Sequence, residues 1–489
     1  MESNNKKKIT ANLIWRFGER VCAQGVAFVV SIILARLLDP EVHGTIALVT
    51  VFITILEVFM THGIGTALVQ KKDATNTDFS TAFYFNVVFS WILYGVLFLC
   101  APGIASFYHR PELTSIVRVL SIVLVVAAVK NIQHAYVARH MMFHKFFFAT
   151  LGGTIGAAVI GIWMAYKGYG VWALVTQSLF NHTVDTIILW FTVRWRPTKE
   201  FSFQSLKQLY SYGWKLLVSE LINKTYTELR ALIIGKKYTS SDLAFYNKGE
   251  QFPKLIVRNV NSSIDSILLP TMSRAQDDKN KVRLMTSRAI KTSTFVMMPL
   301  MVGLAVCAEP LVRLILTEKW IPCVPFLRIY CFVFAFYPIH TANLNAIKAV
   351  GRSDYFLKLE IIKKIIGLIA LLITMNISVE AMAYSLLVTT VLAQIINSWP
   401  NRKLLNYKYE RQIMDILPQV LLSCFTGAVV YSVFFLHLGD ILSLIIQIPL
   451  GIIIYITCAK LFRFDSFDYL ISIIKSFLIT RKKQTSKRE

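Results

Sequence analysis

Long apolar runs separated by short polar segments dominate the chain from residue 11 onward. A helix needs about 20 mostly apolar residues to cross a bilayer. By this criterion the runs predict membrane spans near residues 11–38, 43–68, 79–101, 115–137, 146–166, 169–193, 209–234, 251–271, 288–309, 322–347, 357–376, 379–399, 413–436 and 441–462. The pattern therefore predicts an all-α integral membrane protein with about fourteen transmembrane helices.

Composition supports this interpretation. Hydrophobic residues make up 55% of the 489 residues and charged residues only 16%, whereas soluble domains carry about 25% charged residues. The net charge of +24 alone would suggest a nucleic-acid partner. However, the basic residues lie in short loops between apolar runs, as in polytopic membrane proteins. We therefore expect contact with membrane lipids and no nucleic-acid partner.

The basic residues also predict the orientation, because cytoplasmic loops are enriched in Lys and Arg. With the N-terminus inside, the inner segments contain most of these cations, among them Arg139, Arg274 and Arg402. The outer loops contain few, such as Lys167 and Lys319. Both termini are therefore predicted to be cytoplasmic.

Two stretches about 200 residues apart resemble each other. Trp15-Arg16 through Leu34-Ala35-Arg36-Leu37 matches Trp214-Lys215 through Ile234-Gly235-Lys236-Lys237. The offset covers six spans, which is typical of a parallel repeat in transporters. We expect two six-helix lobes at residues 1–200 and 201–405 and two additional transmembrane helices at 406–463. An amphipathic, basic cytoplasmic tail at 464–489 then either lies along the inner leaflet or acts as a solubilising tail.

Ionisable residues inside spans are functional candidates, because each costs at least about 2.5–3.5 kcal/mol at a helix centre. In the first span Arg16, Glu19 and Arg20 share a stripe about 100° wide, given 3.6 residues per turn. The stripe either lines a polar cavity or reflects arginines that reach back to lipid headgroups.

The seventh span carries a second polar feature. Glu220, Lys224 and Glu228 form a ridge of alternating charge at i, i+4 and i+8, and Lys215 points roughly to the opposite side. The ridge is either functional or a self-neutralising structural pairing. Glu57 and Asp185, in other spans, either serve function or form hydrogen bonds between helices.

The sequence lacks the motifs that are typical of several classes of enzyme and transporter. The sequence contains no Walker A motif, no G-x-G-x-x-G before a helix and no H-E-x-x-H. The seven cysteines have no C-x-x-C spacing and lie mostly in apolar runs, which predicts free thiols and no metal site. We expect a protein that is not an enzyme and holds no cofactor.

Three segments match a known family. Ile33-Leu34-Ala35-Arg36-Leu37-Leu38-Asp39-Pro40-Glu41 resembles the end of the first helix in polysaccharide transport proteins, and similar matches occur at Gly63 to Asp73 and Gly168 to Val175. From about residue 10 to 460 the chain resembles a Wzx-type polysaccharide transport flippase of the multidrug/oligosaccharidyl-lipid/polysaccharide exporter superfamily. It is similar to the colanic-acid exporter branch.

The resemblance implies two six-helix lobes around a V-shaped cavity in a bacterial cytoplasmic (inner) membrane. It implies export of undecaprenyl-pyrophosphate-linked oligosaccharide repeat units for capsule, exopolysaccharide or O-antigen, by alternating access. Coupling to H⁺, Na⁺ or the membrane potential is expected, with polysaccharide polymerase machinery as a partner. The cationic cavity residues of the family match Arg16, Arg20 and Lys215.

A pyrophosphate and a sugar cannot cross hydrocarbon unaided, whereas Arg and Lys can replace their lost hydration. We therefore predict a substrate-binding set of Arg16, Arg20, Lys215 and Lys224. The predicted coupling or cavity carboxylates are Glu19, Glu57, Asp185, Glu220 and Glu228.

Three alternatives remain open at this point. A lipid II flippase of peptidoglycan synthesis would use the same chemistry on a different sugar. A cation-coupled multidrug antiporter would favour a carboxylate-rich cavity. A membrane-bound acyl- or glycosyltransferase would need a reactive His or carboxylate in a loop near the membrane.

Overall fold

The computed structural model describes residue 18 and residues 22–142, 144–472 and 475. Every regular element within these ranges is helical. The chain divides into two compact units, residues 1–244 and 245–489, and each is described here by itself.

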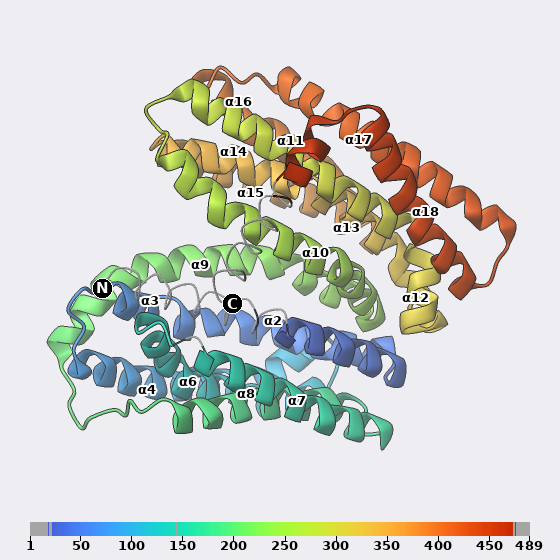
Figure 1. The fold of residues 1–489 in the computed structure, drawn as a ribbon. Helices are drawn as coiled ribbons and strands as arrows, with labels where there is room; N and C mark the ends of the chain where they lie inside the picture. Colours follow the sequence, from blue (N-terminus) through green and yellow to red (C-terminus); the bar gives the residue numbers. More distant parts are fainter. Residues whose placement is uncertain (1–17, 19–21, 143, 473–474, 476–489) are drawn as a thin grey trace, which may run out of the picture. The chain divides into compact units, whose positions relative to one another are not determined.

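The first unit begins, in its described part, with the helix Cys22–Leu37. The helices that follow are α2 (Pro40–Thr61), α3 (Ile64–Gln70), α4 (Asn76–Phe107), α5 (Leu113–Leu120), α6 (Ile122–Arg139), α7 (His144–Tyr166), α8 (Val171–Thr192) and α9 (Phe203–Lys237) (Figure 1). The boundary at Ala244 follows α9, so α9 belongs to this unit. The division at residue 200, which the sequence repeat predicts, stays a prediction. The division into compact units does not test whether the two halves repeat each other.

The second unit takes most of α10 (Ser240–Ser273), which begins just before the boundary. Its other helices are α11 (Lys279–Val306), α12 (Ala308–Leu316), η1 (Glu318–Cys323), α13 (Val324–Ala335), α14 (Tyr337–Ala349), α15 (Ser353–Thr374), α16 (Val379–Leu404), α17 (Tyr409–Ser432), η2 (Val433–Leu436) and α18 (Asp440–Leu461).

These helices match the predicted membrane spans. In the described ranges, 9 helical segments are long and apolar enough to cross a membrane, from Pro40–Gln70 to Asp440–Leu461. The described part of the first predicted span coincides with Cys22–Leu37, and the other four coincide with α8, α9, α10 and α15, which are shorter or more polar. The protein is therefore a multi-pass, all-α membrane protein, as the apolar pattern predicts.

Local sequence signals explain several helix boundaries. Asp39 is the N-cap of α2 and Pro40 its first residue, where the missing N–H of proline costs nothing. Thr75 and Asp78 form a capping box at the start of α4. The two stretches of the predicted repeat end alike, with a two-residue helix break at 38–39 and at 238–239.

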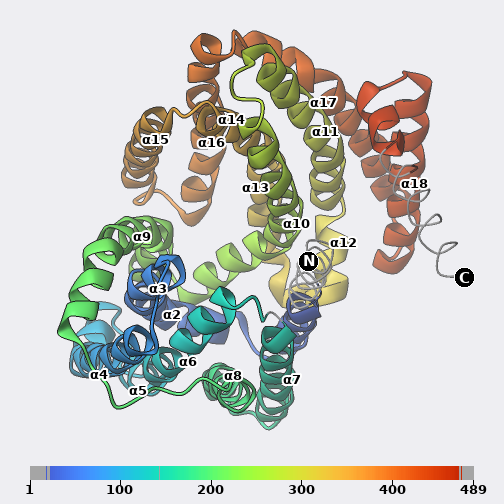
Figure 2. The same cartoon turned by 60° about the vertical axis from the view of Figure 1, so that its left-hand side comes forward.

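Glycines bring α7 and α8 close together in the first unit (Figure 2). A Cβ atom added to Gly153 would lie 2.8 Å from Asn181 Oδ1, and one added to Gly156 would lie 2.8 Å from Phe180 Cε1. Small residues permit such close backbone approach in membranes, where packing rather than water drives helix association. The contact fixes the face that α8 turns toward α6.

Helix α9 runs antiparallel to α2 and contacts it along the whole length of α2. Gly44 at the start of α2 meets Ser240 just after α9, and Gly63 after α2 meets Gly213 early in α9. A Cβ atom on Gly213 would lie 2.6 Å from the carbonyl carbon of Gly63. Gly63 has φ +111°, a value that favours glycine. The two helices therefore depend on glycine at both ends of their contact.

The second unit contains a polar network around Asp415 of α17. The carboxylate accepts hydrogen bonds from Ser287 Oγ at 2.6 Å and Tyr407 OH at 2.5 Å, and Lys291 Nζ lies 3.1 Å from its other oxygen. Three partners, two from α11 and one from the segment before α17, thus meet at one carboxylate. Such a fully partnered network ties the start of α11 to α17.

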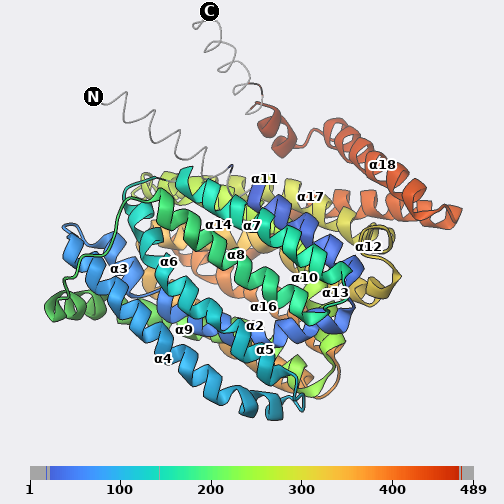
Figure 3. The ribbon, with the colours of Figure 1, turned by 90° about the horizontal axis from the view of Figure 1, so that it is seen from below.

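The segment after α18 packs onto the second unit. Residues 465–472 are helical, and Phe464 and Phe467 contact a cluster that includes Phe295 and Tyr455. Figure 3 shows α17 and α18, which precede this segment in the chain, side by side. Residues 476–489 of the predicted tail lie outside the described residues, so its predicted relation to the leaflet stays untested.

Candidate functional site

A row of alternating charges crosses four helices of the first unit. Lys130 Nζ on α6 lies 2.8 Å from Asp185 Oδ2 on α8. Lys224 Nζ on α9 lies 2.8 Å from Glu228 Oε1 one turn further along. Glu57 on α2 lies within electrostatic range of both Lys130 and Lys224. We call these five residues, Glu228, Lys224, Glu57, Lys130 and Asp185, the charge row.

The Lys130–Asp185 pair is the most enclosed part of the charge row. The two side chains are only 12% and 11% exposed. The pair joins α6 to α8, and its two residues are 55 positions apart in the sequence. Ionised groups taken out of water are expensive unless they are paired, so each residue of this pair depends on the other.

Two histidines flank this pair. His134 follows Lys130 by one turn of α6, and His182 precedes Asp185 by nearly one turn of α8. Both rings interact electrostatically with Lys130 and Asp185. His134 also packs on Phe146, with ring centroids 4.6 Å apart.

Several polar atoms at this pair lack a protein partner. Among the described residues, Asp185 Oδ1, His134 Nε2 and His182 Nδ1 are buried without a hydrogen bond. A buried polar atom left unsatisfied costs about 1–3 kcal/mol. Native proteins seldom retain such a cost without a role or an ordered water, and intramembrane ionisable residues are functional candidates in their own right.

The structure brings together four of the predicted site residues. Glu57, Asp185, Lys224 and Glu228 all belong to the charge row. Lys215 is exposed and Glu220 half-buried, and neither forms an ion pair with any described residue. The predicted ridge on α9 is thus paired only between Lys224 and Glu228.

The predicted residues of the first span, Arg16, Glu19 and Arg20, lie outside the described residues. Their assignment therefore stays a prediction. The predicted roles of Lys215 and Lys224 in substrate binding stay predictions too. Lys224 would have to leave Glu228 to contact an anionic group.

Sequence reasoning missed His134 and His182 as site residues. A usable signal was present, because each stands about one helical turn from an ionisable residue inside an apolar run. Within the described ranges, no group of three or more His, Cys, Asp or Glu side chains is arranged to hold a metal ion.

The charge row consists of two ion pairs with a fifth charged group, Glu57, between them. Glu57 lies near two lysines that already have carboxylate partners. A change in the charge of Glu57, or the approach of an anion, would therefore alter both neighbouring pairs. Charges in a low-dielectric site interact more strongly than charges in water.

Curated relatives share much of the chain. TuaB of Bacillus subtilis (strain 168), a teichuronic acid biosynthesis protein, is 25% identical over 308 residues, which are 61% of this chain and 62% of TuaB. ExoT of Rhizobium meliloti (strain 1021), a succinoglycan biosynthesis transport protein, is 24% identical over 65% of this chain and 64% of ExoT. The chain thus spans less than two thirds of the length of these two relatives. WzxC of Escherichia coli (strain K12), a lipopolysaccharide biosynthesis protein, is 24% identical over 80% of each chain.

Solved structures show the same fold. The lipid II flippase MurJ in an inward closed conformation superposes with a TM-score of 0.77 at 14% identity, over 93% of this chain and 98% of MurJ. An inward-facing multidrug resistance MATE transporter of the MOP superfamily gives 0.60 at 14% identity, over 78% of this chain and 94% of the transporter. At this identity the likeness concerns the fold alone.

A family model described as "Polysaccharide biosynthesis protein" matches residues 33–325. This match begins in the first described helix, includes the whole charge row and extends into α13. It covers more than half of the 489 residues. The chain therefore belongs to this family of polysaccharide biosynthesis proteins, as the resemblance in its sequence indicates.

Proposed function

We propose that this protein is a flippase that moves a polyprenyl-pyrophosphate-linked oligosaccharide from the cytoplasmic to the outer leaflet of a bacterial cytoplasmic membrane. The observation that carries this proposal is the family match over residues 33–325. Relatives in this group are named for polysaccharide biosynthesis and, in the case of ExoT, for transport. The exported units would supply capsule, exopolysaccharide or O-antigen assembly, next to polysaccharide polymerase machinery.

The charge row supports transport of a polar group through the membrane. A polyprenyl tail is soluble in lipid, whereas a pyrophosphate and a sugar are not. A helix bundle that holds charges between its helices can replace the hydration these groups lose. We infer that Arg16, Arg20, Lys215 and Lys224 contact the pyrophosphate during loading at the inner face, with both termini cytoplasmic.

The membrane potential favours the proposed direction. A diphosphate diester carries about two negative charges, and the cell interior is negative. Outward movement is then favoured by about 4–5 kcal/mol per 100 mV, at roughly 2.3 kcal/mol per charge. We infer that no cofactor is needed and that Glu57, Asp185 and the other row carboxylates couple transport to H⁺, Na⁺ or the potential.

A depletion strain tests the proposal. We expect lipid extracts from cells depleted of this protein to contain an accumulated polyprenyl-pyrophosphate oligosaccharide that the parent strain lacks. Its mass identifies the repeat unit, and lipid II in its place would favour the peptidoglycan alternative. Accumulation of toxic cations without any lipid-linked sugar would favour the antiporter alternative.

A charge-reversal variant sharpens this test. We expect Arg16→Glu to abolish polymer export while the protein remains in the membrane at the parental level. The matched variant Arg16→Lys keeps the charge and should retain export in part, because lysine offers a single point charge in place of two parallel donors. Normal polymer output from a well-expressed Arg16→Glu variant would contradict the assigned role of Arg16.

A further inference from the structure

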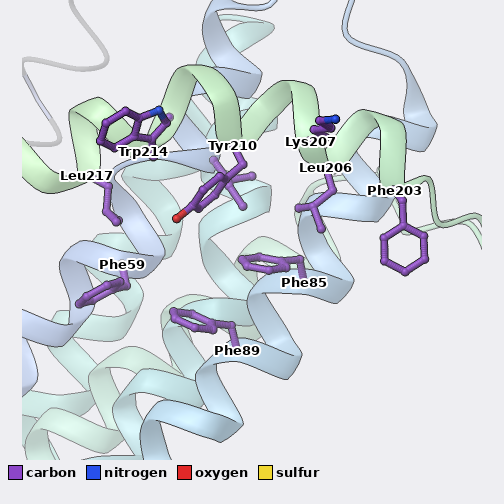
Figure 4. Close-up of a pocket in the computed structure, with 12 residues that line it drawn as sticks. Phe59, Phe85, Phe89, Phe203, Leu206, Lys207, Tyr210, Trp214 and Leu217 are labelled. Carbon is purple, nitrogen blue, oxygen red and sulfur yellow. The ribbon is translucent and has the colours of Figure 1, made fainter.

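An aromatic cavity lies in the first unit between α2, α3, α4 and the first turns of α9 (Figure 4). Its volume is about 610 Å³, within the range of about 300–1,000 Å³ that is usual for small-molecule sites. Six aromatic side chains line it, namely Phe59, Phe85, Phe89, Phe203, Tyr210 and Trp214. We call this space the aromatic cavity.

The walls of the aromatic cavity are ordered by ring contacts. Phe85 and Phe89 stack with centroids 5.6 Å apart, and Phe59 contacts Phe89 at 6.0 Å. Figure 4 shows Tyr210 reaching from α9 toward Phe85 and Phe89. The Gly63–Gly213 contact closes one edge, because both glycines line the cavity.

The cavity is reachable from outside the unit. Phe203 is 80% exposed, Tyr210 51% and Trp214 44%. Because these rings are exposed, a ligand outside the unit can reach the cavity between them. Aromatic residues also concentrate near the membrane–water interface, which agrees with the position of these residues at the start of α9.

One cation lines this otherwise mostly apolar cavity. Lys207 is exposed and makes no ion pair with any described residue. The neighbouring cation Lys71 is already engaged, at 2.8 Å from Asp78 Oδ1 and 3.3 Å from Gln208 Oε1. An uncompensated lysine beside an aromatic cavity is the arrangement expected for a ligand with an apolar chain and an anionic head.

We propose that the aromatic cavity binds the isoprenoid chain of a polyprenyl phosphate lipid, with Lys207 contacting its phosphate group. The proposal rests on the proposed flippase function, which makes a polyprenyl lipid the substrate. It adds a site for the chain that is separate from the charge row. Bound there, the lipid would be held beside the α2–α9 contact before its polar head is transferred.

The aromatic lining and the volume of the cavity favour an isoprenoid over a linear acyl chain. An isoprenoid carries a methyl branch in every unit, so it presents more contact area per unit length to the ring faces. Where a ligand leaves part of the cavity empty, both the ligand and the cavity wall lack dispersion contacts there. A linear chain would leave more of the 610 Å³ volume without contacts.

Photo-crosslinking to the purified full-length protein tests this proposal. The probe is tetraprenyl phosphate with a terminal diazirine, compared with uncharged tetraprenol and with palmitoyl phosphate carrying the same group. We expect the first probe to label peptides containing Phe85, Phe89 or Tyr210, and palmitoyl phosphate to label them less. Leu206→Trp, which fills the cavity, should block labelling by both tetraprenyl probes.

A charge variant provides the matched comparison. We expect Lys207→Gln to weaken labelling by tetraprenyl phosphate about two- to fivefold, the range of a solvent-exposed ion pair, and to leave tetraprenol labelling unchanged. Lys199→Gln, in the loop before α9 and outside the cavity, should alter neither. The Lys207 comparison stands even if Leu206→Trp fails to fold.

Two results would overturn the proposal. Equal labelling by palmitoyl phosphate would make the cavity an ordinary lipid site, and labelling elsewhere in the chain would leave it without a ligand. Either result, together with accumulated lipid-linked sugar in depleted cells, would refute the chain site and leave the flippase function intact. Specific labelling without such accumulation would instead refute the flippase function.

Discussion

At the scale of single residues, the Lys130–Asp185 pair is the most enclosed ion pair of the charge row. Lys130→Met leaves Asp185 as an unpaired charge between helices, and we expect a loss of about 3–5 kcal/mol in unfolding free energy. Asp185→Leu should cost a similar amount. The double variant should recover most of the loss, since neither charge then remains. Unfolding of the purified variants in detergent measures this, and additive losses would contradict the pairing.

Glu57 carries a second prediction at this scale. Because it lies near both lysines of the charge row, we expect Glu57→Gln to fold normally but to remove the dependence of transport on external pH or sodium. Export measured across a pH and sodium series checks this. Glu41→Gln is the matched control, because Glu41 lies on the same helix in an exposed pair with Arg110. An unchanged dependence in Glu57→Gln would exclude Glu57 from coupling.

The sequence predicts the members of the charge row better than it predicts their pairing. Glu57 and Asp185 stand out because each is ionisable within an apolar run, and Lys224–Glu228 follows from helical spacing. The contact between Lys130 and Asp185 depends on which faces of α6 and α8 meet. No local pattern determines that. The histidines beside the pair were missed although their spacing from Lys130 and Asp185, about one helical turn, is visible in the sequence.

At the scale of elements, the contact between α2 and α9 depends on Gly213. A Cβ atom there would lie 2.6 Å from Gly63 backbone, so we expect Gly213→Ala to displace α9 and cost about 1–3 kcal/mol, as overpacking does. Thermal unfolding and export rate both check this. Gly95→Ala in α4 meets open space and should be neutral or slightly stabilising. Equal stability of the two variants would contradict the tight contact.

Helix positions were the most predictable feature of the elements. Apolar length is a local property, so every predicted span, as far as it lies within the described residues, falls on one or more helices. The aromatic cavity was not predictable, because Phe85, Phe89 and Phe203 lie in two segments that are far apart in the sequence. Only the crossing of α9 over α3 and α4 encloses them, and that crossing depends on contacts between segments more than 100 residues apart, such as Lys71 with Gln208, 137 positions away.

At the scale of the whole molecule, the family match places the protein among polysaccharide biosynthesis proteins, and its helices form a multi-pass membrane fold. Under the proposed function, the charge row would contact the polar head of the lipid-linked sugar and the aromatic cavity its apolar chain. A substrate with both a charged head and a long apolar chain needs both.

Transbilayer movement itself is the central claim, and reconstitution measures it most directly. The lipid-linked oligosaccharide that accumulates in depleted cells would be placed in liposomes with the purified protein, and the fraction of its sugar that reaches an external lectin would be followed over time. We predict that the protein exposes the sugar from the inner leaflet much faster than empty liposomes do, and that Arg16→Glu abolishes this gain. Equal rates with and without the protein would contradict the flippase account.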